Sequence, residues 1–160
     1  MQTLDFQSPL GIIEIIGDEQ GIFSILFAER EYIQFPKKTD TFATLIECQQ
    51  QLEEYFEGKR FSFTIPFIFK GTPFQQEVWQ ALTTVPYGKT ASYKDIAILV
   101  GNEKAVRAIG TTNSKNLVSI IVPCHRIIGA NGKLTGYAGG LWRKEWLLKH
   151  EQKYLSITNA

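Results

Sequence analysis

One short stretch of the sequence, residues 120–128, combines reactive side chains with apolar flanks. Cys124 is followed by a histidine and an arginine, and isoleucines and a valine surround the three. Charged side chains are rare in buried segments unless they are paired. A thiol is a nucleophile as its thiolate, and nearby cationic groups favour that form. Cys124 is therefore a candidate nucleophile, and a small buried cysteine without a chemical role is the ordinary alternative.

Pro123 bears on how this cysteine is held. Proline donates no hydrogen bond to a strand ladder and disfavours helix at the preceding residue, so we expect a strand to end at Val122. Cys124 would then lie at a sharp exit from the core. Adjacent strand residues point to opposite faces, so a water molecule would have to connect the thiol with His125. Glu145, on a separate predicted helix, could orient or ionise His125 and complete an activated-nucleophile arrangement.

The composition is typical of a soluble globular protein, with 44% hydrophobic and 21% charged residues. We find no apolar run long enough to span a membrane and no basic-then-apolar leader, so we expect a cytoplasmic protein with no membrane partner. The two cysteines are expected to be reduced thiols. The spacing of cysteines and histidines matches no zinc pattern, so we expect no metal.

Charge is distributed unevenly along the chain. Residues 1–69 contain five Lys or Arg against eleven Asp or Glu, a net charge of −6. Residues 70–160 contain twelve against five, a net charge of +7, and the two parts give the total of +1. Such asymmetry is a hint that the basic part binds nucleic acid, and chance together with a solvated surface is the ordinary alternative.

The first part of the chain predicts an α+β unit. Strand-like stretches separated by short turns indicate an antiparallel meander over residues 3–7, 12–16 and 22–28. Asp40 can cap a following helix, which we expect to end at Gly58. Residues 61–69 alternate in polarity and predict another extended segment, with Pro66 placing part of it at an edge.

The second part of the chain predicts helices. Thr72 and Pro73 are typical of one helix start, and Ser92 with Asp95 of another. Asn102 would cap a helix over residues 103–113, giving a helix-turn-helix pattern. Its inward residues would be Ala105, Val106 and Ile109, and its outer face would carry Lys104, Arg107, Ala108 and Thr111. A turn at 129–132, a glycine-rich segment at 134–140, a last helix at 141–150 and a tail from 154 complete the pattern.

The sequence Pro-Cys-His-Arg at residues 123–126 resembles the active-site signature of the O6-alkylguanine-DNA alkyltransferases, also called methylated-DNA–protein-cysteine methyltransferases. The resemblance runs over residues 71–151, roughly half of the 160 residues. Its ordered blocks are GTPFQ at 71–75, VW at 78–79, PYG at 86–88, SY at 92–93, AVRAIG at 105–110, Asn116, GYAGG at 136–140 and KEWLL at 144–148.

The resemblance implies a role for each matching residue. Cys124 would accept the alkyl group, activated through a Cys–water–His–Glu relay with His125 and Glu145. Arg107 would fill the space left by an extruded base, and Tyr93 would help rotate the nucleotide and protonate the departing guanine. We also expect DNA contacts from Lys104, Ala105, Thr111 and Arg126, a hinge at Asn116, base-edge contacts from the main chain of Val122, Cys124 and Ile127, and a covering loop with Tyr137, Ala138 and Gly139.

Ala138 is a point of variation, because relatives can have a serine there whose hydroxyl donates to O6. Alanine leaves that donation to main-chain amides, so the preferred alkyl group stays open.

We therefore predict an α+β protein with two domains. Residues 1–70 would form a small antiparallel-sheet plus helix unit that serves as scaffold. Residues 71–160 would form a mostly helical domain with a helix-turn-helix and the active-site cysteine. The predicted activity is irreversible, single-turnover transfer of an alkyl group from O6-alkylguanine in double-stranded DNA to Cys124, with O4-alkylthymine left open. We expect a monomer that needs no cofactor.

Three other functions remain open at this stage. A non-catalytic lesion-binding relative would recruit other repair factors, but such proteins lack the nucleophilic cysteine. A cysteine hydrolase could use the same Cys, His and Glu on an acyl substrate. A plain helix-turn-helix regulator would need no Cys–His pair.

Overall fold

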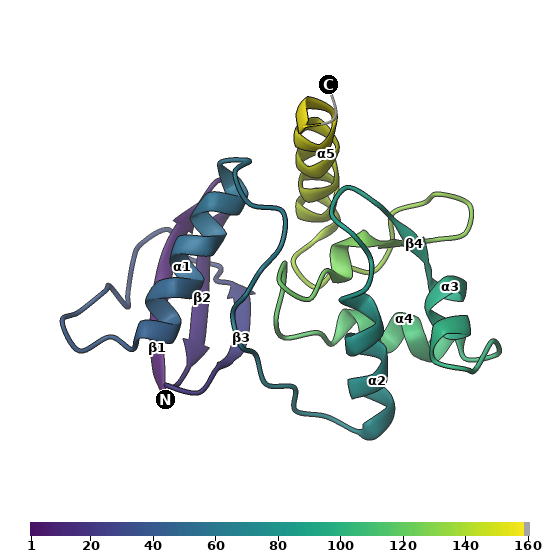
Figure 1. The fold of residues 1–160 in the computed structure, drawn as a ribbon, viewed down its shortest axis with the longest axis horizontal. Helices are drawn as coiled ribbons and strands as arrows, with labels where there is room; N and C mark the ends of the chain where they lie inside the picture. Colours follow the sequence, from purple (N-terminus) through teal and green to yellow (C-terminus); the bar gives the residue numbers. More distant parts are fainter. Residues whose placement is uncertain (159–160) are drawn as a thin grey trace. The chain divides into compact units, whose positions relative to one another are not determined.

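The computed structural model describes residues 1–158. The chain divides into two compact units, Met1–Lys70 and Gly71–Ala160. Both units combine helices with strands, which confirms the predicted α+β class (Figure 1). No helix within residues 1–158 is long and apolar enough to cross a membrane.

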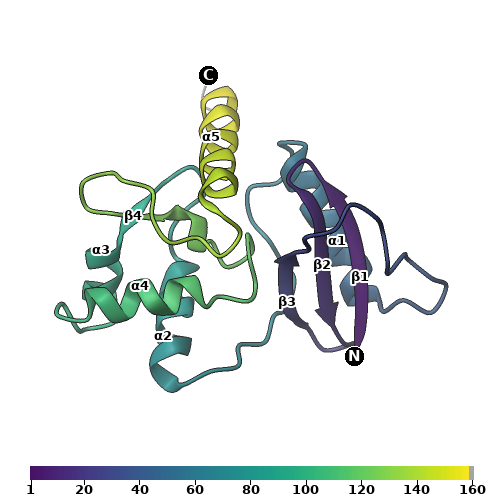
Figure 2. The same ribbon diagram turned by 180° about the vertical axis from the view of Figure 1, so that it is seen from behind.

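A three-stranded antiparallel sheet, in the order β1 (Gln2–Ser8), β2 (Gly11–Gly17), β3 (Ile22–Phe27), forms the N-terminal unit. The predicted meander is therefore confirmed. Gly11 has a φ of 105°, which lets the chain reverse tightly between β1 and β2. Helix α1 (Ala43–Phe56) packs against β1 and β2 (Figures 1 and 2). The buried residues of the helix form a mostly apolar stripe at helical spacing.

The predicted cap of α1 is wrong. Phe42 occupies the N-cap position and makes no side-chain cap hydrogen bond. Asp40 lies two residues earlier, and its carbonyl accepts a hydrogen bond from Gln2 at 3.0 Å. The loop is thus tied to β1, which places Asp40 outside the helix start.

The segment 61–69 makes only one bridge in the described chain, where Phe67 pairs with Ile22 of β3. The Ile22 amide donates to the Pro66 carbonyl at 2.9 Å, so Pro66 does lie at an edge of the sheet. The rest of the segment packs on α1, since Thr64 accepts a hydrogen bond from Gln51 at 2.8 Å. The alternating polarity therefore reflects contacts with a helix more than membership of the sheet.

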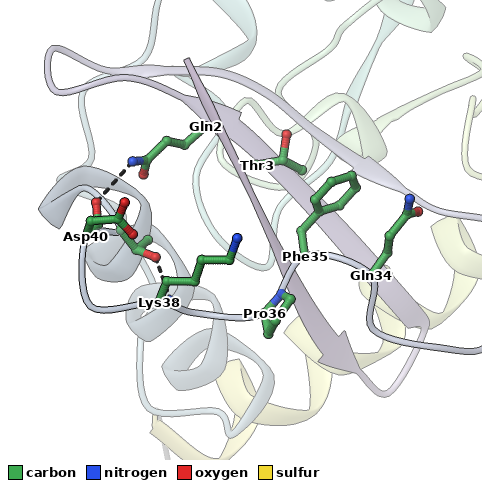
Figure 3. Close-up of a pocket in the computed structure, with 8 residues that line it drawn as sticks. Gln2, Thr3, Gln34, Phe35, Pro36, Lys38 and Asp40 are labelled. Atoms are coloured by element: carbon green, nitrogen blue, oxygen red, sulfur yellow. Dashed lines mark hydrogen bonds between the residues drawn. The ribbon is translucent and has the colours of Figure 1, made fainter.

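A buried carboxylate secures the long connection between β3 and α1. Asp5 accepts hydrogen bonds from the amides of Gln34 and Phe35 at 2.7 and 2.9 Å, and pairs with Arg30 at 2.8 Å. Beside this connection lies a pocket of about 290 Å³ (Figure 3). Its lining contains no thiol or imidazole and consists of Gln2, Thr3, Gln34, Phe35, Pro36, Lys38, Asp40 and Thr41.

The C-terminal unit is mostly helical. Its helices are α2 (Pro73–Leu82), α3 (Tyr93–Leu99), α4 (Val106–Ser114) and α5 (Leu141–Thr158). Two short strands, β4 (Ala91–Ser92) and β5 (Ile127–Ile128), pair in parallel. Capping boxes open α2 at Thr72 and α3 at Ser92, as the sequence predicts.

Helices α3 and α4 pack together, and Gly101 with a φ of 79° reverses the chain between them. The predicted start of the second helix is wrong, because residues before Val106 form a turn. Val106 is 39% exposed at the helix start, so its predicted inward position is also wrong. The buried stripe instead consists of Ile109, Thr112 and Asn113, which follow the i, i+3, i+4 spacing of one helix face.

Helix α5 continues beyond its predicted end, so the expected tail is wrong for residues 154–158. Side chains one turn apart contact each other here: the His150 ring lies 4.8 Å from those of Trp146 and Tyr154. The last part of the predicted tail, residues 159–160, lies outside the described residues.

Candidate active site and nucleic-acid interface

Cys124 opens a short 3-10 helix, η1 (Cys124–Arg126), which follows a turn. The strand predicted to end at Val122 is therefore wrong. The chain bends at Ile120, whose φ of 71° is uncommon for a β-branched residue, and the Val122 amide bonds back to the Val118 carbonyl at 3.0 Å. This reversal places Cys124 inside the core on a fixed backbone.

The Cys124 thiol is buried, with 5% of the residue exposed. Burial raises the pKa of the thiol, while a hydrogen bond from Asn116 and the charge of Lys144 act in the opposite direction. The net effect is a thiol that is protonated at neutral pH. Nucleophilic use of Cys124 therefore requires a base that removes this proton.

His125 is the candidate for that base. Its Nε2 lies 2.7 Å from Glu151 Oε2, and both side chains are buried. A carboxylate only accepts hydrogen bonds, so Nε2 carries the proton and Nδ1 carries the lone pair. Burial lowers the pKa of His125, which keeps the imidazole neutral. Nδ1 is buried and has no hydrogen-bond partner within residues 1–158, so it is free to accept a proton.

The carboxylate that holds His125 is Glu151, and the predicted role of Glu145 is wrong. Glu145 pairs at 2.8 Å with Lys149 at the surface of α5. Glu145 and Glu151 are six residues apart on α5, which separates their side chains by roughly 240° around the helix axis. The two glutamates therefore face different directions. Lys144, Leu147 and Glu151 are fully buried at i, i+3 and i+7, so Glu151 lies on the buried face of α5.

Arg126 belongs to the same buried network. Its Nε and Nη2 donate to the two Glu151 oxygens at 2.9 and 3.1 Å, and its Nη1 donates to the Val85 carbonyl at 2.7 Å. Arg126 is only 6% exposed, so the predicted DNA contact is wrong. Burial would raise the pKa of Glu151, but His125 and Arg126 outweigh it and hold the pKa well below its usual range.

This network predicts a loss of stability in acid. In the unfolded chain the pKa is about 6.5 for His125 and about 4.3 for Glu151. In the folded protein both pKa values are lower. The free energy of unfolding should therefore fall as pH drops through this range. Melting temperatures measured from pH 7 to pH 3 check this, with Glu151→Gln expected to flatten the acid limb. A melting temperature that stays constant to pH 4 would contradict it.

The glycine-rich segment reaches this site through Tyr137. Tyr137 is buried, and this burial raises the pKa of its hydroxyl. The neighbouring Cys124 raises that pKa further. At the other end of the segment, the Tyr93 hydroxyl lies 3.1 Å from the carbonyl oxygen of Thr135. Lys144 Nζ donates to the carbonyls of Thr135 and Ile127, and burial lowers its pKa to about 8. The segment is thus tied to α3, β5 and α5.

Two asparagines connect α4 with the nucleophile. Asn116, the predicted hinge, donates to the Val122 carbonyl at 2.9 Å and accepts from the Val118 amide at 3.0 Å. Asn113, which sequence reasoning missed, donates from α4 itself to the Cys124 carbonyl at 3.3 Å. Its signal was a polar residue four positions after Ile109 on the buried face of the helix.

A groove of about 580 Å³ lies between α2 and α4. Three cations line it, Lys104, Arg107 and Lys115, and all three are exposed. The groove also contains Thr111, which we expected at the DNA interface, whereas Ala105 is half-buried in its wall. Phosphate groups are bound by such exposed cations, so this face suits a nucleic-acid backbone.

The predicted covering residues differ in exposure. Ala138 is exposed and Gly139 is half-buried.

The carbonyls of Val122 and Ile127 already accept hydrogen bonds from Asn116 and Lys144. These main-chain groups therefore have fixed positions beside Cys124.

Known proteins are similar to both units of the chain. Residues 73–153 match the family described as 6-O-methylguanine DNA methyltransferase, DNA binding domain. Residues 5–69 match the 6-O-methylguanine DNA methyltransferase, ribonuclease-like domain. The two matches together include most of the chain.

Individual relatives are similar over nearly their whole length. A methylated-DNA–protein-cysteine methyltransferase of Methanosarcina acetivorans is 48% identical over 148 residues, which cover 91% of this chain and 95% of that protein. The constitutive one of Bacillus subtilis is 46% identical, covering 83% and 84%. The crystal structure of Mycobacterium tuberculosis OGT in complex with DNA matches with a TM-score of 0.85 and 39% identity, covering 96% of this chain and 94% of that one. The chain belongs to the 6-O-methylguanine DNA methyltransferase family.

Proposed function

We propose that this protein repairs double-stranded DNA by moving an alkyl group from O6 of guanine to Sγ of Cys124. The observation that carries the proposal is the buried set of Cys124, His125 and Glu151, which lies in the same unit as the basic groove. The names of the relatives, methylated-DNA–protein-cysteine methyltransferase, support it. The N-terminal unit serves as scaffold, and the C-terminal unit binds DNA and performs the transfer.

The chemistry follows from the protonation states in the site. His125 Nδ1 takes the proton of the Cys124 thiol through one water molecule, while Glu151 stabilises the imidazolium that forms. The thiolate attacks the alkyl carbon, an S–C bond forms, and the bond from that carbon to O6 breaks. The electron pair of the broken bond goes to guanine, which Tyr93 protonates at N3.

The reaction ends with Cys124 as a thioether. A thioether is a poor leaving group, and Cys48 is buried in the N-terminal unit, where burial raises its pKa to about 12. No regenerating thiol is therefore supplied by the chain, and each molecule acts once. Both cysteines are free thiols, which is consistent with our proposal of a cytoplasmic location.

A base inside the duplex has to leave the stack before its O6 substituent can reach a buried thiol. Arg107, which is exposed on α4 and lines the groove, would occupy the vacated position. Gly110 is on the same helix, and a Cβ there would lie 3.8 Å from the Tyr93 ring, so Tyr93 packs beside α4. Lys104 and Lys115 would hold the phosphates on either side.

Arg107→Ala should slow transfer from duplex DNA about ten-fold or more. Extruding the base from the stack costs a few kcal/mol of free energy, and the arginine would offset part of that cost. Reaction with the free base O6-benzylguanine should keep its rate, since no stack has to be opened. Single-turnover rates on both substrates check this. Lys115→Ala is the matched control because it removes a proposed phosphate contact. It should weaken DNA binding and reduce the salt dependence of that binding, while the transfer rate at saturating DNA stays unchanged. Equal losses on duplex and free base would contradict the role of Arg107.

One experiment separates this function from its alternatives. The protein is incubated with duplex DNA whose O6-methylguanine carries a radiolabelled methyl group. Label that becomes bound to protein supports the proposal. Retained lesion binding without transfer would indicate a non-catalytic binder, and repeated turnover of an ester would indicate a cysteine hydrolase.

A further inference from the structure

The first turn of α5 contains two buried cations, Arg143 and Lys144, which are 6% and 0% exposed. The dipole of a helix disfavours positive charge at this end, and burial adds a desolvation cost. Their hydrogen bonds have to compensate for this. Lys144 binds the carbonyls of Ile127 and Thr135, which ties one end of the glycine-rich segment.

Arg143 binds the other end of that segment. Its Nη1 donates to the Gly139 carbonyl at 2.9 Å. Its guanidinium carbon lies 4.6 Å from the ring centroid of Trp142. A Cβ on Gly140 would lie 3.3 Å from Cδ1 and Nε1 of the same indole, so the Trp142 ring packs on the backbone that Arg143 holds.

These contacts fix the turn formed by residues 137–140. The Gly140 amide donates to the Tyr137 carbonyl at 2.9 Å, which closes the turn. A peptide bond is planar, so holding the Gly139 carbonyl also fixes the direction of the Gly140 N–H. Tyr137, at the start of the turn, is buried next to Cys124. Arg143 thus anchors the far end of a turn whose near end lies at the nucleophile.

We propose that Arg143 is a positioning residue for the alkyl transfer, which acts by fixing the turn at residues 137–140 over the extruded base. The inference rests on the proposed function and deepens it. Arg143 is buried and is not one of the cations that line the groove at α4. Its substitution should therefore change the rate of the transfer step and not the affinity for DNA.

Arg143→Leu removes the hydrogen bond to Gly139 and keeps an apolar stem. It should lower the single-turnover rate at saturating methylated DNA about ten-fold or more, because small displacements of positioning groups have effects of this size. Its dissociation constant for the same DNA should stay close to that of the wild type. Arg143→Lys, which keeps one charged donor, should recover part of the rate.

Lys149→Leu is the matched control. It removes a cation from the same helix at an exposed site that pairs only with Glu145 in the described salt bridges. Its transfer rate should equal that of the wild type. Tryptophan fluorescence adds a structural readout: Arg143→Leu should change the Trp142 contribution, assigned by comparison with Trp142→Phe, whereas Lys149→Leu should not.

The outcomes distinguish the two levels of the proposal. A wild type that transfers no methyl group overturns the proposed function and the role of Arg143 with it. A wild type that transfers, together with an Arg143→Leu rate within two-fold of it, overturns the role of Arg143 alone. A loss of DNA affinity that accounts for the whole loss of rate also overturns it. If Arg143→Leu does not fold, Arg143→Gln replaces it, and an unchanged rate for that variant has the same meaning.

Discussion

Cys124→Ala should abolish alkyl transfer and leave the binding of lesion-containing duplex close to that of the wild type. The variant loses the thiol sulfur that would accept the alkyl group, while the cations of the groove on α4 stay in place. Because the side chain is small and buried, its removal leaves at most a small cavity. Radiolabel transfer and a gel-shift titration on the same preparation check both halves of the prediction.

Cys48→Ala is the control for this experiment. Cys48 is buried on α1 in the N-terminal unit, and burial raises its pKa to about 12, which keeps it a thiol. The variant should transfer alkyl groups at the wild-type rate, with some loss of stability from the cavity. If the Cys124→Ala protein became labelled, or if the Cys48→Ala protein transferred no alkyl group, the nucleophile would have been assigned incorrectly.

Glu151→Gln should lower the transfer rate by about 10² or more, which is the scale of a lost general-base function. A neutral amide stabilises the His125 imidazolium less than a carboxylate does. The same change leaves the buried Arg126 without its charge partner, so the free energy of unfolding should fall by about 3 kcal/mol. Denaturant unfolding and single-turnover kinetics measure the two effects.

Glu145→Gln is a matched control on the same helix. Glu145 forms an exposed i, i+4 pair with Lys149, and such pairs contribute about 0.3–0.5 kcal/mol. Neither rate nor stability should change much. If the Glu145 variant lost transfer and the Glu151 variant kept it, the relay would run through Glu145, as the sequence alone suggested, and the arrangement around His125 would be wrong.

The nucleophile and its histidine could be predicted from the sequence because they are adjacent and form part of a recognisable signature. The carboxylate could not be chosen as easily, because Glu145 and Glu151 lie on one helix and only the buried face decides between them. Arg126 was misassigned for a related reason. Its partner lies 25 residues away, and a local pattern does not distinguish a buried ion pair from a DNA contact.

Local rules predicted the helix starts at Thr72 and Ser92, where a capping residue and its partner are three positions apart. They failed where tertiary contacts decided the backbone. The left-handed conformation of Ile120 opposes the intrinsic preference of a β-branched residue, so no propensity predicts the turn before Cys124. Asn113 shows the same limit, since its bond to the Cys124 carbonyl exists only once α4 is packed.

The central claim is that Cys124 receives the alkyl group once. The most direct test is to incubate the protein with an excess of duplex containing O6-methylguanine, digest it, and weigh the peptides by mass spectrometry. The account predicts one methyl group per chain, on the peptide that contains Cys124, and no further repair after that single turnover. An unmodified Cys124 peptide alongside repaired DNA, or repair that continues beyond one lesion per chain, would contradict it.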